Sequence, residues 1–325
     1  MTENSDPGRR EAMPDGGATT ASPTISVLVS SYNYAGYVVD AVRSVLRQSY
    51  PALEIVVVDD GSRDDSVAVL RAAFGDDPRV LLIEQDNAGQ LAAWRNGFAY
   101  LRGDVVALLD SDDLWEPGYL ERIAAVYREH ADVGFVYTNM LLFGDVERPM
   151  LRDREDRDLG ISILLGAFVH RWQATATSAL SLRRPLMTRI LDMPAAMAAE
   201  WVSRPDDCLA FGSEILGARK FYLGDTLVRH REHGRNALKD YSAAPLNTCR
   251  YMARGERMLE FYRARAGVTP RWLRIAKAEF RTKPRPTFFE LRAYSWLLFR
   301  APMPLTKRIE HWFGMLSHYL RARRR

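Results

Sequence analysis

Short apolar segments alternate, along the first part of the chain, with segments whose apolar positions recur every three or four residues. The apolar segments are rich in β-branched residues and are bounded by turn residues, which is typical of buried strands. Leu91, Trp94 and Phe98 lie between two such segments and share one helical face. Alternating strands and helices predict a parallel sheet covered by helices on both faces. The predicted strands are residues 25–29, 54–58, 80–83, 105–109 and 133–137.

The pattern is less regular in the second half of the chain. It predicts a strand at 178–182, a helix around 207–216 and a short strand around 221–223. From about residue 241 the apolar spacing is helical, and prolines interrupt it. Because proline cannot continue a helix, we expect several short helices in this part. The prolines are Pro270, Pro284, Pro286, Pro302 and Pro304.

Polar side chains follow three of the predicted strands. Residues 30–33 (SSYN) follow the first strand, 59–62 (DDGS) the second and 110–113 (DSDD) the fourth. Ligands of open parallel sheets bind at the carboxyl ends of the strands. We therefore expect these three loops to converge on one cleft.

The segment 110–113 carries three carboxylates in four residues. Carboxylates one residue apart after a strand can point at a common cation, and their oxygens suit Mg²⁺ or Mn²⁺. Such a cation would neutralise a departing diphosphate. The alternative is a solvated turn that caps a helix starting near residues 115–117, since Asp is a good N-cap and Pro suits the first turn. The density of carboxylates behind a buried strand favours a functional site.

The other polar loops give weaker signals by themselves. A carboxylate such as Asp60 can accept hydrogen bonds from a nucleobase or ribose, and Tyr32 can stack on a base. Residues 87–90 (NAGQ), together with residues 95–97 on the next helix, offer donors for phosphate or sugar hydroxyls. Each of these segments also fits an ordinary turn, a helix cap or an exposed helix face.

Taken in chain order, the motifs resemble those of the bacterial family 2 glycosyltransferases, which are inverting enzymes with the GT-A fold. The resemblance covers residues 24–236 and rests on SYNYAGYV, VVVDDGS, DNAG followed by RNG, and LDSDD. It implies an α/β domain with a Rossmann-like, mostly parallel sheet and helices on both faces. It also implies a nucleotide-sugar donor, with UDP as the default, and Mn²⁺ or Mg²⁺ as cofactor.

The resemblance assigns roles to individual residues. Asp207, in a pair with Asp206 where the family has Glu-Asp, corresponds to the catalytic base. The alternative for this pair is structural: both carboxylates would only stabilise the N-terminus of a helix. His233 and Arg231 belong to a segment in which His230 replaces a common Tyr, and they correspond to a metal ligand and a diphosphate-binding residue. The implied nucleotide-binding residues are Ser30, Tyr32, Asn33, Asp60, Asn87 and Asp110, and the implied metal ligands are Asp112, Asp110 and His233.

The resemblance and the composition together predict the domain organisation. Residues 1–23 are rich in Gly, Pro, Asp, Thr and Ser, which predicts a disordered tail. The GT-A domain is expected at 24–236, with a nucleotide-binding half at 24–115 and an acceptor half at 116–236. A basic helical region, which forms a C-terminal extension of this domain, is expected at 237–325.

Charge is distributed unevenly along the chain. Residues 271–325 hold 14 Lys and Arg and three Asp and Glu, which gives this region a charge of +11. The net charge of the whole chain is +4, so the other residues together carry a charge of −7. Basic residues beside aromatic ones suit the surface of an anionic membrane. They equally suit helices that pack on the domain and leave a solvated basic face. Binding to nucleic acid is disfavoured because the acidic body would oppose it.

The remaining sequence features concern the cellular location and the class of protein. The chain has two cysteines and no CxxC, which excludes a disulfide framework and a zinc ribbon. So few cysteines favour a protein of the reducing cytoplasm. No apolar stretch has the length of a membrane span, so any membrane contact is expected to be peripheral, on the inner face. The dinucleotide and P-loop glycine motifs are absent. The acceptor is expected to be a glycan, a lipid-linked saccharide or another hydroxyl compound.

Two other functions stay open at this point. The chain could be a non-catalytic nucleotide-sugar binder or scaffold. It could also be a phosphatase with an aspartate nucleophile, because Asp110-Ser111-Asp112 resembles the DxD motif of that class. In such phosphatases the motif usually follows the first strand, whereas here three predicted strands precede it.

Overall fold

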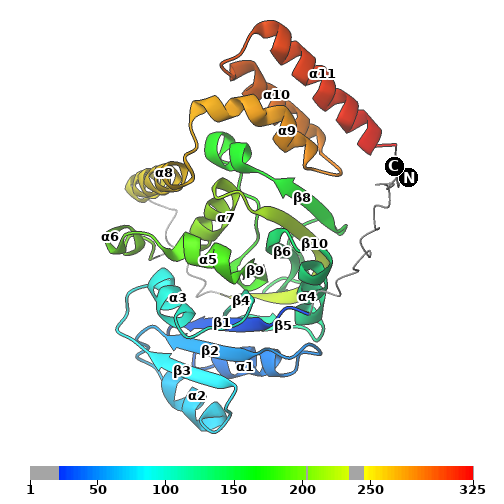
Figure 1. Ribbon diagram of the computed structural model, residues 1–325. Coiled ribbons are helices and arrows are strands. Elements are labelled where there is room, and N and C mark those ends of the chain that lie inside the picture. The colour runs from blue at the N-terminus through cyan, green and yellow to red at the C-terminus, as the bar shows by residue number, and fades with distance from the viewer. Residues whose placement is uncertain (1–21, 203, 234–244, 325) are drawn as a thin grey trace, which may run out of the picture.

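A computed structural model of the protein describes residues 22–202, 204–233 and 245–324. These residues fold around one sheet of ten strands (Figure 1). The path through the sheet is β3-β2-β1-β4-β9-β6-β10-β5, with β7 beside β6 and β8 beside β10. The strands are β1 (Ile25–Ser31), β2 (Glu54–Asp59), β3 (Val80–Glu84), β4 (Val105–Asp110), β5 (Leu114–Trp115), β6 (Val133–Gly144), β7 (Arg148–Pro149), β8 (Arg157–Ile161), β9 (Leu180–Arg183) and β10 (Arg219–Glu232).

The sheet is mixed but mostly parallel along its main path. β1 pairs in parallel with β2 and β4, β2 with β3, and β6 with β10. β9 is antiparallel to both β4 and β6 and so joins the two parallel halves. The α-helices are α1 (Val38–Leu46), α2 (Ser66–Phe74), α3 (Gln90–Phe98), α4 (Tyr119–Glu129), α5 (Arg184–Leu191), α6 (Ala195–Ala198), α7 (Asp206–Ile215), α8 (Pro245–Ala266), α9 (Ala276–Arg281), α10 (Phe288–Arg300) and α11 (Leu305–Ala322).

The core lies on both faces of the sheet because successive strand residues point to opposite sides. On β1, Val27 and Val29 join a buried cluster with residues of α1, α2 and α4. Leu28, between them, belongs to the cluster formed with α3, α5, α7 and α8, which includes Trp94. The predicted α/β architecture with helices on both faces is confirmed.

A third hydrophobic cluster holds α9, α10 and α11 together, next to Leu164 and Leu165. This helical unit is joined to β8 by buried polar contacts. Lys283, 1% exposed, donates to the carbonyl oxygens of Leu159 (2.6 Å) and Ile161 (3.2 Å) and to Ser162 Oγ (2.8 Å). The C-terminal helices therefore pack on the sheet domain, as Figure 1 shows.

Three expectations about local structure are met only in part. The strand around 221–223 is present but lies near the start of β10, which has 14 residues because β6 also pairs with its polar end. The chain breaks at the prolines near residues 270, 284 and 302, but the helices between the breaks are not all short, and α11 has 18 residues. The helix considered near residues 115–117 begins at Tyr119, because Leu114 and Trp115 pair with β10.

The predicted domain limit at residue 236 does not separate the helices of the tail from the core of the sheet domain. α8 lies beyond residue 237 but contributes Met258, Leu259 and Tyr262 to a core cluster of the sheet. The limits at 115 and 236 stay predictions. The predicted disordered tail lies almost wholly outside the described residues. Within those residues, every helix is too short or too polar to cross a membrane.

Candidate active site

The loops after β1 and β2 are joined by hydrogen bonds. The backbone N–H of Asn33 donates to Ser62 Oγ (2.8 Å), and the N–H of Arg63 donates to Asn33 Oδ1 (2.8 Å). Asn33 adopts a left-handed φ of 58°, a conformation that Asn tolerates better than most residues. The Ser-Tyr-Asn loop and the DDGS loop therefore form one unit, as the position of both at strand ends predicts. Tyr32 is exposed at the edge of this unit.

Asp60 organises the loop that precedes α3. Its Oδ1 accepts from Gln85 Nε2 (2.8 Å) and from the N–H of Ala88 (2.9 Å), and its Oδ2 accepts from the N–H of Gly89 (2.8 Å). A carboxylate offers about four lone-pair sites, so Asp60 retains acceptor capacity for a nucleotide. Asn87 lies exposed on the same loop.

Gln90, at the start of α3, connects this loop to the acidic cluster. Its side-chain amide donates to Ser30 Oγ (2.9 Å) and to Asp110 Oδ1 (2.5 Å). The ends of β1 and β4 and the start of α3 therefore meet at one amide. The sequence analysis placed Gln90 in a segment of possible donors but did not assign it a role at the acidic cluster.

Asp112 and Asp113 face β10. Asp112 Oδ2 lies 3.1 Å from His233 Nε2. Asp113 is fully buried; its carboxylate accepts from the N–H of Arg231 (2.8 Å) and lies 2.9 Å from His230 Nδ1. The two aspartates thus have different contacts. Asp113 connects the turn after β4 to β10, and the carboxylate of Asp112 lies next to the imidazole of His233.

Negative charge is concentrated at this end of the sheet. Burial raises the pKa of Asp110 well above its usual range, and the charges of Asp113 and Asp112 add to the effect. Burial and the charge of Asp113 also raise the pKa of Asp112. Burial opposes the charged form of His230, but its hydrogen bond with Asp113 and the charge of that carboxylate raise its pKa to about 9. A protonated His230 compensates only part of this negative charge.

Two tyrosines of the SYNYAGYV segment also belong to the site. The ring of Tyr37 stacks on His233 with 5.5 Å between ring centroids, and the Arg231 guanidinium lies 4.7 Å from the centroid of Tyr37. Arg231 Nε donates to the backbone oxygen of Asp112 (2.9 Å). Burial and the carboxylate of Asp112 raise the pKa of Tyr34. The sequence prediction used only Tyr32 and Asn33 of this segment.

The donors at this site suit a hard divalent cation. Carboxylate oxygen and imidazole nitrogen are both ligands of Mn²⁺, and Mg²⁺ often takes one or two carboxylates and leaves its other positions to water and substrate phosphates. The adjacent Asp112 and His233 fit such a two-ligand arrangement. Across the described residues, no group of three or more His, Cys, Asp or Glu side chains is placed to hold a metal. Asp110 is therefore not brought together with the other two as a preformed triad.

Asp207 opens α7 with Asp206, as predicted. Its carboxylate is 2% exposed. Oδ2 accepts a 2.6 Å hydrogen bond from the hydroxyl of Tyr251 on α8, and Oδ1 lies 3.3 Å from Arg204 Nη2. Burial and the charge of Asp207 raise the pKa of Asp206 to about 7. No signal in the sequence pointed to Tyr251.

The segment before α7 lies against the donor-side loops. A Cβ on Gly89 would lie 3.1 Å from the Cα of Val202, so these two backbones are in close contact. Gly89 also donates to Asp60, and its neighbour Gln90 reaches Asp110. Asp207, five residues after Val202, is thus on a segment that contacts the loop before α3, and Gln90 at the end of that loop contacts the acidic cluster.

The sequence relationships agree with this geometry. Residues 26–186 match the profile of glycosyl transferase family 2. A stretch of 221 residues, 65% of this chain, is 34% identical to an uncharacterised glycosyltransferase of Nostoc sp. and covers 66% of it. The chain belongs to glycosyl transferase family 2.

A shorter match connects this glycosyltransferase to the chondroitin synthase of Escherichia coli. It is 35% identical over 116 residues, which cover 36% of this chain and 17% of the synthase. The chain thus spans less than two thirds of the length of both relatives.

The fold is similar to that of S. aureus TarS 1–349 in complex with UDP-GlcNAc. The TM-score is 0.54 at 17% sequence identity, with 92% of this chain and 81% of that chain covered. At this identity the likeness concerns the fold alone, and it confirms the predicted GT-A class with C-terminal helices. The roles of the individual site residues stay predictions.

Proposed function

We propose that this family 2 glycosyltransferase moves a sugar from a nucleoside-diphosphate sugar, with UDP as the expected nucleotide, to a hydroxyl acceptor. The product belongs to polysaccharide or glycoconjugate synthesis. The observation that carries the proposal is the junction at Gln90, which connects the ends of β1 and β4 to the loop held by Asp60. One donor can contact all of these groups at once. The low cysteine content is in keeping with a cytoplasmic reaction.

The nucleotide is bound by the unit of the first two loops. Asp60 accepts one further hydrogen bond from the base, and the exposed ring of Tyr32 stacks on the base. Ser30, Asn33 and Asn87 supply further polar contacts to the nucleotide. A UDP-sugar in the fold neighbour TarS supports uridine as the base.

The acidic cluster and β10 bind the diphosphate. Asp112 and His233 would hold Mn²⁺ or Mg²⁺, with Asp110 as the further ligand expected from the sequence, and the guanidinium of Arg231 would bind phosphate oxygens. When bound, the cation would supply positive charge that stabilises a departing diphosphate. Asp113 and His230 keep β10 and the β4 turn in register, so that Asp112 and His233 stay adjacent.

Asp207 acts as the base on the acceptor side. It takes the proton from the acceptor hydroxyl while that oxygen forms a bond to the anomeric carbon. The bond from this carbon to the diphosphate breaks on the opposite face, and the diphosphate leaves with the electron pair. Attack from the opposite face inverts the configuration. Tyr251 and Arg204 orient the Asp207 carboxylate for this step.

A donor panel tests the proposal. Purified protein is incubated with UDP-, dTDP- and GDP-sugars, with and without Mn²⁺, and the release of nucleoside diphosphate is measured in the presence of candidate acceptors. We expect release from a UDP-sugar that depends on Mn²⁺. Tight donor binding without release for every pair tested would instead indicate a non-catalytic binder. Hydrolysis of a phosphomonoester without nucleoside diphosphate release would indicate the phosphatase.

A further inference from the structure

We propose that α10 and α11 form a docking surface for an anionic lipid bilayer, and that this surface is separate from the donor and acceptor site. The surface is a stripe of exposed apolar side chains on α11, flanked by exposed aromatic residues of α10 and bordered by arginines. Its lipid partner does not depend on which sugar the enzyme transfers.

The stripe on α11 follows helical spacing. Leu305, Ile309, Phe313 and Leu320 lie on one side of the helix, at successive offsets of four, four and seven residues, and are between 42% and 61% exposed. Because side chains at such offsets lie above one another on a helix, they form a continuous row. The opposite side of α11 contributes the buried Met315 to the cluster with α9 and α10. The helix is therefore apolar on two sides, and only one of them is used for packing.

The neighbouring α10 adds large aromatic side chains. Of the 17 large hydrophobic residues that are exposed in the described part of the chain, eight lie between residues 288 and 320. Single exposed apolar residues are ordinary, but a concentration of this size marks an interaction surface. The α10 members are Phe288, Phe289, Trp296 and Phe299.

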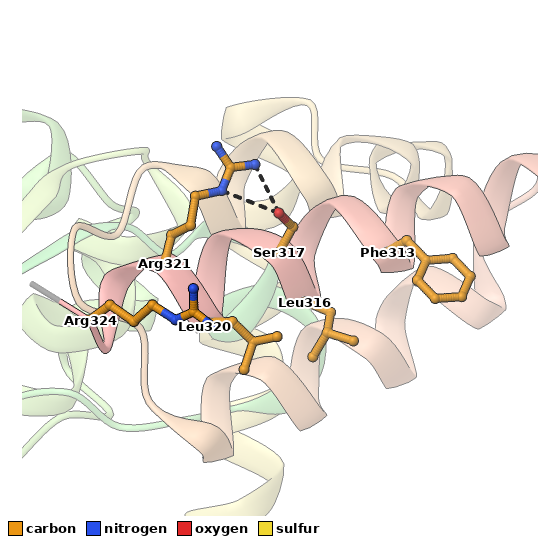
Figure 2. A pocket seen from close by; sticks show the side chains of 6 residues that line it. All are labelled: Phe313, Leu316, Ser317, Leu320, Arg321 and Arg324. Atoms are coloured by element: carbon orange, nitrogen blue, oxygen red, sulfur yellow. Dashed lines mark hydrogen bonds between the residues drawn. The ribbon is translucent and has the colours of Figure 1, made fainter.

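Figure 2 shows the C-terminal half of the stripe from close by. Phe313, Leu316 and Leu320 project from the same side of α11, and Arg324 lies next to Leu320. Arg321 turns to the other side, where it donates to Ser317. A hollow of about 360 Å³ runs along these residues. Apolar side chains with guanidinium groups beside them suit the boundary between acyl chains and phosphate headgroups.

The charge of this region identifies the partner as anionic. Residues 271–325 carry 14 Lys and Arg and three acidic residues. Glu279 and Glu290 are buried, and Glu310 is paired with Lys307 at 2.8 Å. The accessible charge is thus almost entirely positive. A second copy of the chain would place two such surfaces against each other, so charge opposes self-association.

The width of the apolar surface favours lipid over an acidic protein. A peptide partner usually fills a groove between elements, whereas here the apolar residues project outward from two adjacent helices. Trp and Phe are favoured at membrane interfaces, and basic residues are attracted by anionic lipids within a Debye length. Such docking would hold the transferase at a membrane surface.

Vesicle sedimentation tests the proposal with the full-length protein. Vesicles of phosphatidylcholine alone are compared with vesicles that also contain phosphatidylglycerol, at low and high salt. We expect binding only to the anionic vesicles and weaker binding at high salt. The variant F313E/L320E should bind on the order of tenfold more weakly. R324Q, which neutralises the arginine beside Leu320, should bind more weakly and show a smaller salt dependence.

The matched control is L81E, which places the same charge on an exposed apolar position of β3 at the opposite edge of the sheet. It should bind vesicles like the wild type. Circular dichroism and nucleoside diphosphate release check that all variants are folded. The proposal is overturned if the wild type does not bind anionic vesicles, or if F313E/L320E binds them with the affinity of the wild type. It is also overturned if light scattering shows a dimer that F313E/L320E dissociates while no vesicle binding occurs.

Discussion

The hydroxyl of Tyr251 on α8 donates a 2.6 Å hydrogen bond to Oδ2 of Asp207 at the start of α7. The two residues are 44 positions apart, and both lie beyond the segment 26–186 that matches the family. α8 therefore contacts the candidate base as well as the core of the sheet domain.

Replacing Asp207 with Asn should abolish sugar transfer while sparing donor binding. The amide keeps the shape of the side chain but cannot take a proton from the acceptor, and a general base contributes typically 10²–10⁴-fold to the rate. The measurement is initial rate together with donor affinity by calorimetry. Asp206→Asn is the matched control and should retain most of the activity. Unchanged turnover of Asp207→Asn would contradict its assignment as the base.

Tyr251→Phe should lower kcat several-fold with little change in KM for the donor. The substitution removes one hydrogen bond to a charged group, worth roughly 1.5–3 kcal/mol, and leaves Asp207 less well oriented. Tyr262→Phe is the control, because its buried hydroxyl donates to the carbonyl of Ile190, away from Asp207. Equal effects of both variants on kcat and on thermal stability would reduce Tyr251 to a structural role.

Asp112→Asn and His233→Gln should each raise the Mn²⁺ concentration needed for half-maximal activity. Both remove a candidate ligand, and loss of a ligand weakens the metal site. EDTA should abolish wild-type activity, and added Mn²⁺ should restore it. Asp225→Asn, which removes a surface carboxylate paired with Arg122, should leave the Mn²⁺ curve unchanged. A wild-type enzyme that works fully in EDTA would argue against any metal role.

Gly61→Ala should weaken donor binding and lower stability. Gly61 has φ of 74°, and a Cβ there would lie 2.7 Å from the backbone nitrogen of Asn87. An L-residue in this region costs roughly 1–2 kcal/mol before the clash is counted. Gly255→Ala on α8 is the control, since a Cβ there has open space. It should stabilise the protein slightly, by about 0.5–1 kcal/mol, because Ala favours the helix.

Glu279 should make stability depend on pH. Burial raises its pKa from 4.5 to about 7, although Tyr294 and Lys283 act in the opposite direction. The folded state therefore holds the proton more tightly than the unfolded state. This stabilisation is complete below the unfolded pKa near 4.5 and is lost as the pH rises through about 7.

Thermal melts of the wild type and Glu279→Gln across this range provide the measurement. Since Gln cannot titrate, the wild type should lose stability relative to the variant, by an amount on the order of 3 kcal/mol. Glu310→Gln, at an exposed site, should follow the wild type. Parallel curves for the wild type and Glu279→Gln would rule out a raised pKa at this carboxyl.

Local sequence patterns were sufficient for much of the first half of the fold. The five predicted strands of that half are present as β1, β2, β3, β4 and β6. Continuous β-branched runs and adjacent turn residues specify such strands whatever surrounds them. The family resemblance implied an acidic pair at the start of a helix, and the structure has it at the start of α7, where carboxylates are favourable.

Features that depend on contacts between distant segments were not predictable. The polar end of β10 reads as a loop in isolation and is a strand only because β6 and β5 pair with it. The tail left open whether its aromatic residues form core or surface, and the structure divides them: Phe280 is buried, whereas Trp296 and Phe313 are exposed. Periodicity identifies an apolar face, but not the partner that covers it.

The candidate site shows the same division. The sequence by itself determined which polar loops follow which strands, because strand ends and turns are set by neighbouring residues. Only the tertiary structure decided that Gln90 bridges Ser30 and Asp110, and that Tyr251 reaches Asp207. Those contacts join residues 20 to 60 positions apart, and their hydrogen bonds exist only once packing of the core has placed the helices on the sheet.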